Sequence, residues 1–158
     1  IGRQNIKSYE HYLVKKTFEE LEKIDGVMLY ITKTKSGEFD RSLITFNLKG
    51  FYPKLVSEIL NKEYGIGTRA GSYCVYEFSR RIHKITHEQD KIITREVKHG
   101  KLTNIPGSVR ASFGFTNNLE DATRLVSAIK EILKKGPINY KNQYKKNEST
   151  GDWAHGEE

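Results

Sequence analysis

Apolar residues recur at helical spacing in three stretches of the chain. Within residues 8–24, apolar side chains return every three or four positions and glutamates lie between them, which predicts an amphipathic helix. A second helix is expected to begin at Pro53, because proline suits the first helical turn. A third follows Asn118, a residue type that caps helix N-termini, and stops at residues 136–137, a Gly-Pro pair.

Short runs of β character separate these helices. The expected strands cover residues 27–31, 43–48, 65–69 and 108–113. Along 43–48, polar Thr45 and Asn47 alternate with apolar residues, so one face of the sheet should be less buried than the other. The order of elements predicts an α+β fold: a small sheet of about four strands with helices packed mainly on one face.

Two segments lie outside this pattern. Residues 84–104 are highly polar and are interpreted as an insertion within the domain formed by residues 1–136, as a hairpin or a helical extension. A short helix from Cys74 to about Ile82 precedes it. Residues 137–158 are expected to form a polar, mostly disordered tail.

Composition narrows the class of protein. The chain has 158 residues, which suits one compact domain, and a single cysteine, which excludes an internal disulfide framework and indicates a reducing, cytoplasmic setting. We expect no membrane span, because no apolar run is long enough. The first residue is Ile1, not methionine, so we expect an upstream part of a larger protein.

The net charge of +7 is compatible with an acidic partner, and a basic α+β module that binds nucleic acid or protein stays an alternative. Because the lysines are scattered as pairs, nucleic acid is not expected as the partner. His83 and His87, four residues apart, can share a helix face, with His99 or Glu88 as a third ligand. In so polar a segment we interpret these histidines as solvated, and we expect no metal site.

Three residues carry candidate chemistry. Arg69 and Arg110 each lie in a short β-like run, and a guanidinium fork matches a carboxylate in bidentate fashion. Cys74, the only cysteine, is either a packing residue or a nucleophile. Asn47, on the more polar face of its strand, is a tentative addition to a substrate site, although a solvated position is the preferred interpretation.

Two motifs resemble a known family. The segment 65–74, GIGTRAGSYC, resembles the G-I-x-x-R-x-G-x-x-C segment of class V aminotransferases and cysteine desulfurases, and 109–120, VRASFGFTNNLE, resembles their x-R-A-S-x-x-x-x-N-x-x-E segment. The opening residues 1–27 are similar to the helix that joins the domains of these enzymes and to the strand after it. Together these segments make the chain similar to the C-terminal small domain of fold-type I enzymes that depend on pyridoxal phosphate (PLP).

The resemblance implies roles for the candidate residues. Arg110 would bind the α-carboxylate of an L-amino acid, with Arg69 beside it near the active-site entrance. In desulfurases and selenocysteine lyases the equivalent of Cys74 attacks the substrate's sulfur or selenium. This chain departs from one desulfurase pattern, because Ser72 and Tyr73 stand where those enzymes have two histidines. Transamination and sulfur transfer therefore both stay open.

The resemblance also implies what lies elsewhere. The lysine that holds PLP belongs to the large domain of the family, so this chain alone is expected to be inactive and to bind no cofactor. The intact enzyme would contain the missing large domain, bind PLP there and form a homodimer.

Overall fold

The computed structural model describes residues 2–30, 42–73 and 76–156. Its larger helices are α1 (Arg3–Leu21), α2 (Pro53–Tyr64), α4 (His87–Lys98) and α5 (Leu119–Lys135), and its shorter ones are α3 (Tyr76–Ile82) and α6 (Pro137–Gln143). The strands are β1 (Val27–Leu29), β2 (Leu43–Leu48), β3 (Arg69–Gly71), β4 (Ser108–Ser112), β5 (Tyr144–Lys146) and β6 (Trp153–His155).

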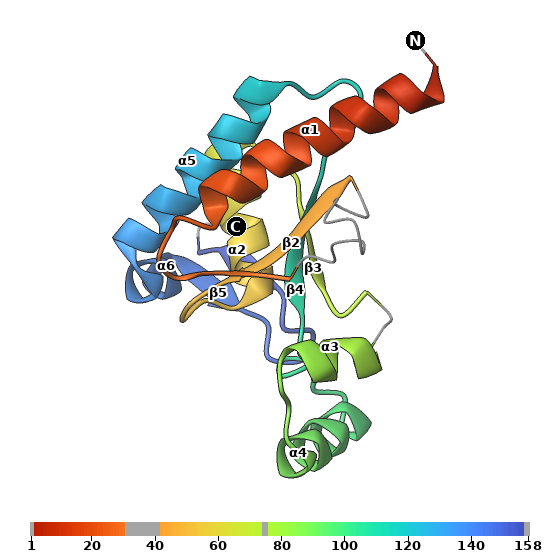
Figure 1. Ribbon diagram of the computed structural model, residues 1–158. Coiled ribbons are helices and arrows are strands. Elements are labelled where there is room, and N and C mark those ends of the chain that lie inside the picture. The colour runs from red at the N-terminus through yellow and green to blue at the C-terminus, as the bar shows by residue number, and fades with distance from the viewer. Residues whose placement is uncertain (1, 31–41, 74–75, 157–158) are drawn as a thin grey trace.

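Four of these strands form an antiparallel sheet in the order β1-β2-β4-β3. Helices α1 and α5 lie side by side over one face of the sheet, and α2 packs beside them (Figure 1). The predicted α+β class, with about four strands and helices mainly on one face, is therefore confirmed.

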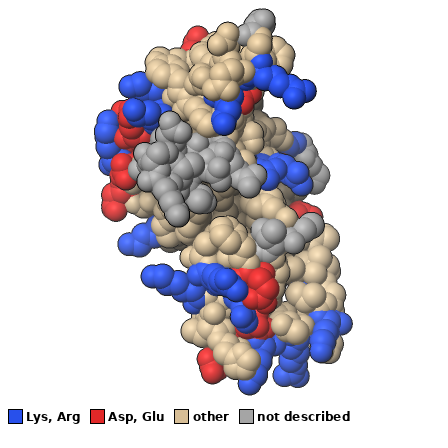
Figure 2. Space-filling view, turned by 45° about the vertical axis from the view of Figure 1, so that its right-hand side comes forward, with Lys and Arg blue, Asp and Glu red and all other residues tan. Residues whose placement is uncertain are grey.

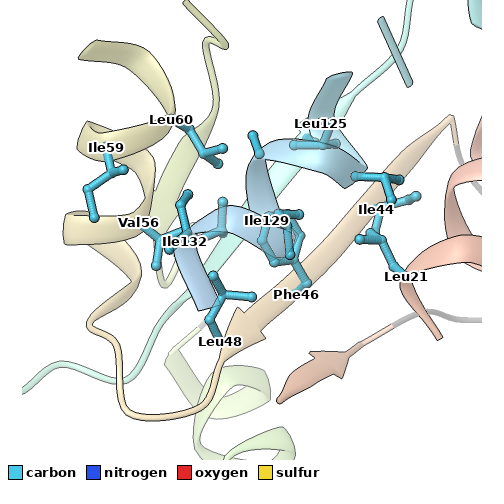
Figure 3. Packing of buried hydrophobic residues seen from close by; sticks show 14 of the residues in the cluster. Leu21, Ile44, Phe46, Leu48, Val56, Ile59, Leu60, Leu125, Ile129 and Ile132 are labelled. Carbon is cyan, nitrogen blue, oxygen red and sulfur yellow. The ribbon is translucent and has the colours of Figure 1, made fainter. Parts of the chain in front are cut away.

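The hydrophobic core fills the space between this sheet and its helices. Ile44, Phe46 and Leu48 alternate along β2 and are at most 1% exposed. Figure 3 shows Phe46 beside Ile129 of α5 and Ile44 beside Leu21 of α1, all within one buried cluster. Because successive side chains of a strand point to opposite faces, the intervening residues of β2 lie on the opposite face of the sheet. We call this the open face, because α1, α2 and α5 pack on the other side.

The start of α5 shows how local sequence sets a helix boundary. Asn118 and Asp121 form a capping box at the start of α5, as the Asn118 cap predicted.

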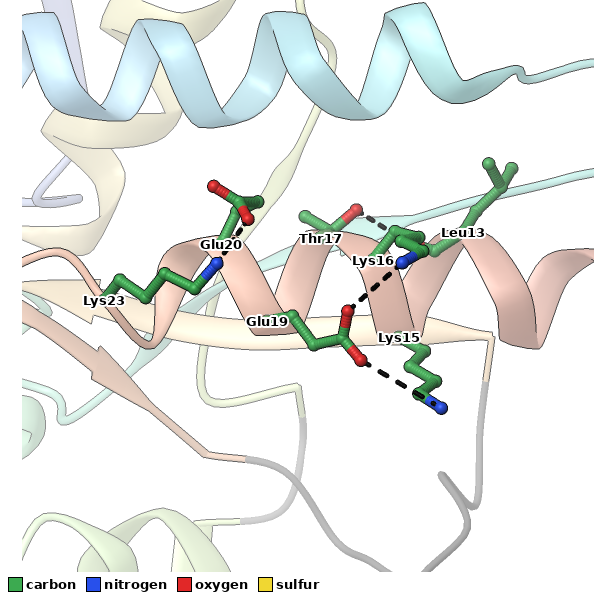
Figure 4. A network of polar contacts seen from close by, with 7 residues as sticks. All are labelled: Leu13, Lys15, Lys16, Thr17, Glu19, Glu20 and Lys23. Carbon is green, nitrogen blue, oxygen red and sulfur yellow. Dashed lines mark hydrogen bonds and ion pairs between the residues drawn. The ribbon is translucent and has the colours of Figure 1, made fainter.

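Exposed ion pairs line the outer surface of α1 and the residues just after it. Glu19 pairs with Lys15 and Lys16, and Glu20 pairs with Lys23 (Figure 4). Such exposed pairs add little stability, so the buried face of α1 fixes its place.

The polar segment 84–104 contains helix α4, which lies with α3 beyond one end of the sheet (Figure 1). Thr86 caps α4 in a capping box with Gln89. Asp90 joins the two helices, since its carboxylate accepts hydrogen bonds from the Tyr76 hydroxyl at 2.7 Å and the Arg80 guanidinium at 2.8 Å. Of the two expected forms, hairpin and helical extension, the structure has the helix.

The C-terminal segment differs from the expected disordered tail. Helix α6 and the β5–β6 hairpin follow the Gly-Pro stop, and Tyr140 and Tyr144 are 0% and 2% exposed. The Lys54 ammonium donates to the Asp152 carboxylate and to the Thr150 carbonyl, each at 2.7 Å. The segment is polar on average, but its few aromatic residues bury enough surface to order it.

Candidate functional site

The open face of the sheet carries a row of polar side chains. Arg110, in the middle of β4, is the cross-strand partner of Thr45 on β2 and of Arg69 on β3. Directly paired residues in a sheet project to the same side, so the two arginines stand together on this face. The structure thus brings together two candidate residues that are 41 positions apart in the sequence (110 − 69).

Arg110 is half-buried, and its surroundings fix its guanidinium group. The guanidinium carbon lies 4.7 Å from the centre of the Tyr73 ring, a cation–π contact. Its Nε is buried and has no hydrogen-bond partner in the part of the chain that the structure describes. No ion pair joins Arg110 to a carboxylate of the described residues. Arg69 is exposed beside it.

Tyr73 bridges the two strands beneath the arginines. Its hydroxyl oxygen lies 2.9 Å from the carbonyl of Arg69 and 2.6 Å from that of Ser108, so its one proton is shared between these two acceptors, the nearer being Ser108. Burial raises the pKa of this phenol to about 12, although the charges of Arg110 and Arg69 act in the opposite direction. The hydroxyl therefore stays protonated and keeps donating at physiological pH.

Asn47 also lies on the open face, but it is not the solvated residue that the preferred sequence interpretation expected. It is 9% exposed, and its Nδ2 donates to the Gly107 carbonyl at 3.0 Å. Its Oδ1 is buried without a hydrogen-bond partner among the described residues. Burial raises the pKa of the nearby Tyr30 phenol, and the Asn47 amide offsets part of this shift. Asn47 thus belongs to the site region.

Sequence reasoning missed the place of His83, which sits at the same end of the sheet. Its Nε2 lies 3.1 Å from the Ser108 hydroxyl, and its ring meets Tyr30 edge-on at 5.0 Å. Burial lowers the pKa of His83, so the neutral imidazole is favoured. Its sequence spacing to His87 gave no sign of this contact, which depends on where α3 meets the sheet.

A cleft of about 290 Å³ opens next to these residues. Asn47, Gly71, His83 and Gly107 line its inner side. Residues 102–106 and residues 52–54, at the start of α2, also line it. Arg69 and Arg110 are not among its lining residues, so the cleft neighbours the two arginines and does not contain them.

The remaining candidates are Cys74, a metal site, a membrane span and a surface for nucleic acid. Cys74 lies outside the described residues. Among the residues that are described, no three His, Cys, Asp or Glu side chains come together in a way that could hold a metal ion, and no helix is long and apolar enough to cross a membrane. Basic side chains are dispersed over the face in Figure 2 and alternate with acidic ones. On this face the described residues form no continuous basic surface of the kind that nucleic acid binds.

Comparisons with known proteins agree with these features. The family model described as Aminotransferase class-V matches residues 1–125. Cysteine desulfurases of Haloferax volcanii and Synechococcus elongatus are each 29% identical to the chain, over 82% and 84% of it. The chain spans only 24% and 17% of the length of these relatives.

Solved structures show the same likeness. The apo structure of the cysteine desulfurase from Thermococcus onnurineus NA1 matches with a TM-score of 0.57 and 27% identity, over 83% of this chain and 26% of that one. The cysteine desulfurase CsdA from Escherichia coli, at 23% identity and a TM-score of 0.53, shares the fold. This chain, with its paired arginines on an open sheet face, belongs to the class V aminotransferase family.

Proposed function

We propose that this chain is the C-terminal small domain of a PLP-dependent enzyme that acts on an L-amino acid, and that Arg110 binds the substrate's α-carboxylate. The observation that carries the proposal is the buried Nε of Arg110, which has no hydrogen-bond partner among the described residues. Buried donors are rarely left unpaired, because each unmade hydrogen bond costs about 1–3 kcal/mol. A carboxylate that bonds to Nε and one terminal nitrogen would satisfy this donor.

The charges on the open face support an anionic ligand. Arg69 is the cross-strand partner of Arg110, so two positive charges stand side by side. Adjacent like charges repel, and an anion between or beside them removes that cost. Holding the carboxylate in a fixed fork would orient the bonds at the substrate's Cα for reaction.

The donor set of this face fits a substrate carboxylate, and we place the covalent attachment of PLP in a large domain outside this chain. When bound, PLP supplies the electron sink that labilises bonds at Cα. The contribution of the described residues is to bind and orient the substrate. The intact enzyme is proposed to be a homodimer, as the family resemblance implies.

The test uses the intact enzyme that contains this chain. Arg110→Gln is compared with wild type on an L-amino acid substrate and on the matching amine that lacks the carboxyl group. We expect kcat/KM for the amino acid to fall about 100-fold, the equivalent of one or two charge-assisted hydrogen bonds, and that for the amine to change little. Arg95→Gln, at an exposed position on α4, is the matched control. Equal losses on both substrates would refute a carboxylate-binding role.

A second candidate activity is sulfur transfer, which is favoured because the relatives named above are cysteine desulfurases. In this reaction the thiolate of Cys74 would attack the sulfur of L-cysteine. The C–S bond would break, its electron pair would stay with the substrate carbon, and protonation there would give alanine and a persulfide on Cys74. Cys74→Ser should then abolish persulfide formation from L-cysteine. Amino-group transfer to a 2-oxo acid that survives Cys74→Ser would instead indicate transamination.

A further inference from the structure

The backbone of Tyr73 adopts a conformation that its side chain disfavours. Its φ is 55°, in the left-handed region that bulky L-residues rarely occupy. Such a conformation persists only where surrounding contacts hold it, and it is found at binding and catalytic sites. The Tyr73 hydroxyl provides that hold, since its one proton is shared between the carbonyls of Arg69 on β3 and Ser108 on β4, 2.9 and 2.6 Å away.

The same side chain forms one wall of the Arg110 environment. With the hydroxyl fixed to two strands, the ring has little freedom to rotate, and the Arg110 guanidinium lies 4.7 Å from its centre. A flexible arginine stacked on a fixed ring loses most of its torsional freedom before any ligand arrives. The conformational entropy that is lost when a ligand binds to the guanidinium is therefore smaller.

We infer that Tyr73 is a positioning residue, which holds the Arg110 guanidinium ready for the substrate's carboxylate and so favours substrates that carry one. The inference rests on the proposed role of Arg110. The ring supplies the stack, and the hydroxyl, whose proton the Arg69 and Ser108 carbonyls share, keeps the ring in place. Tyr73 acts on binding through Arg110 and takes no part in bond breaking.

The experiment separates the ring from the hydroxyl in the intact enzyme. Tyr73→Phe keeps the aromatic face and removes the hydroxyl's shared hydrogen bond, whereas Tyr73→Leu fills similar space without an aromatic face. Each variant is assayed for KM and kcat on the amino acid and on its carboxyl-free amine, beside Arg110→Gln. Thermal unfolding of each variant is measured to establish that it is folded.

We expect Tyr73→Leu to raise KM for the amino acid about tenfold, the size of a well-desolvated cation–π contact, with Tyr73→Phe between it and wild type. Values for the amine and kcat for the amino acid should change little. Tyr12→Leu, at a partly exposed position on α1, serves as the control and should leave every constant unchanged.

Each other outcome has a definite meaning. If Arg110→Gln impairs the amino acid selectively and Tyr73→Leu does not, the positioning role is overturned and the proposed function stands. If Tyr73→Leu impairs both substrates equally, Tyr73 is only structural and the inference is likewise overturned. If Arg110→Gln is itself unselective, the proposed function fails and the inference falls with it.

Discussion

Gly107, the residue before β4, lies close against the backbone of Gly71 at the end of β3, and replacing it tests that packing. A Cβ built at Gly107 would lie 2.8 Å from the carbonyl carbon of Gly71, 2.9 Å from its Cα and 3.0 Å from its oxygen. Non-bonded carbon atoms prefer about 3.5–4.0 Å, so Gly107→Ala forces β3 and β4 apart by several tenths of an ångström or more. The atoms that it meets are backbone, which has no alternative rotamer.

The cost follows from two terms. Overpacking a close contact costs about 1–3 kcal/mol. The Gly107 carbonyl also accepts the 3.0 Å hydrogen bond from buried Asn47, and weakening it adds about 1 kcal/mol. Gly107→Ala should therefore lower the free energy of unfolding by about 2–4 kcal/mol.

The assay is urea denaturation of Gly107→Ala and of a matched control, Gly67→Ala. A Cβ at Gly67 meets nothing within 4 Å and Gly67 has no left-handed φ, so this change should be neutral or stabilise by up to about 1 kcal/mol through the unfolded state. If Gly107→Ala proves as stable as Gly67→Ala, the close approach of Gly107 to Gly71 is refuted, and with it the reasoning that ties β3 to the start of β4.

Two further predictions concern stability and are read by chemical denaturation. Tyr140→Ala, at a position 0% exposed, should destabilise by about 3–5 kcal/mol, whereas Ile138→Ala, at one 76% exposed, should change little; equal small effects would mean that α6 does not pack on the core. The pKa of Asp121 is lowered from its ordinary 3.8 by hydrogen bonds from the Asn117 side chain and the Asn118 backbone, so its stabilisation is present above that pH and is lost as the pH falls through the lower folded value. Asp121→Asn should weaken the dependence of the free energy of unfolding on pH in that acidic range. An unchanged pH dependence would contradict a stabilising role for the Asp121 carboxylate.

The site illustrates where prediction from sequence reached its limit. Alternation along β2 indicated that Thr45 and Asn47 face away from the core, and the structure agrees about the face. It did not indicate that Asn47 is buried or that its amide donates to the carbonyl of Gly107, 60 residues later, because neither is visible in the local pattern. Similarly, the sequence contained the motif that carries Arg110. The contact of Arg110 with the Tyr73 ring depends on the left-handed backbone of Tyr73, which its residue type does not predict.

The tail shows the same limit on a larger scale. Residues 137–156 are polar on average, and average polarity predicted disorder. What ordered them was the burial of Tyr140 and Tyr144 against elements distant in the sequence, including the Tyr144 hydroxyl donating to Glu63 at 3.1 Å. Composition cannot report whether a partner surface exists for a few aromatic side chains.

The sequence by itself determined most elements before residue 137, because periodicity, the Asn118 cap and the Gly-Pro stop are local signals. It missed α6 and the β5–β6 hairpin, and it placed the third strand at 65–69, whereas β3 is Arg69–Gly71. Short motifs in the sequence also predicted the family, which the family model over residues 1–125 confirms. Only the tertiary structure decided which residues meet on the open face, because Arg69, Tyr73, His83 and Arg110 are brought together by strand order and by loop closure. Those are long-range consequences of burying one common core, which no local pattern encodes.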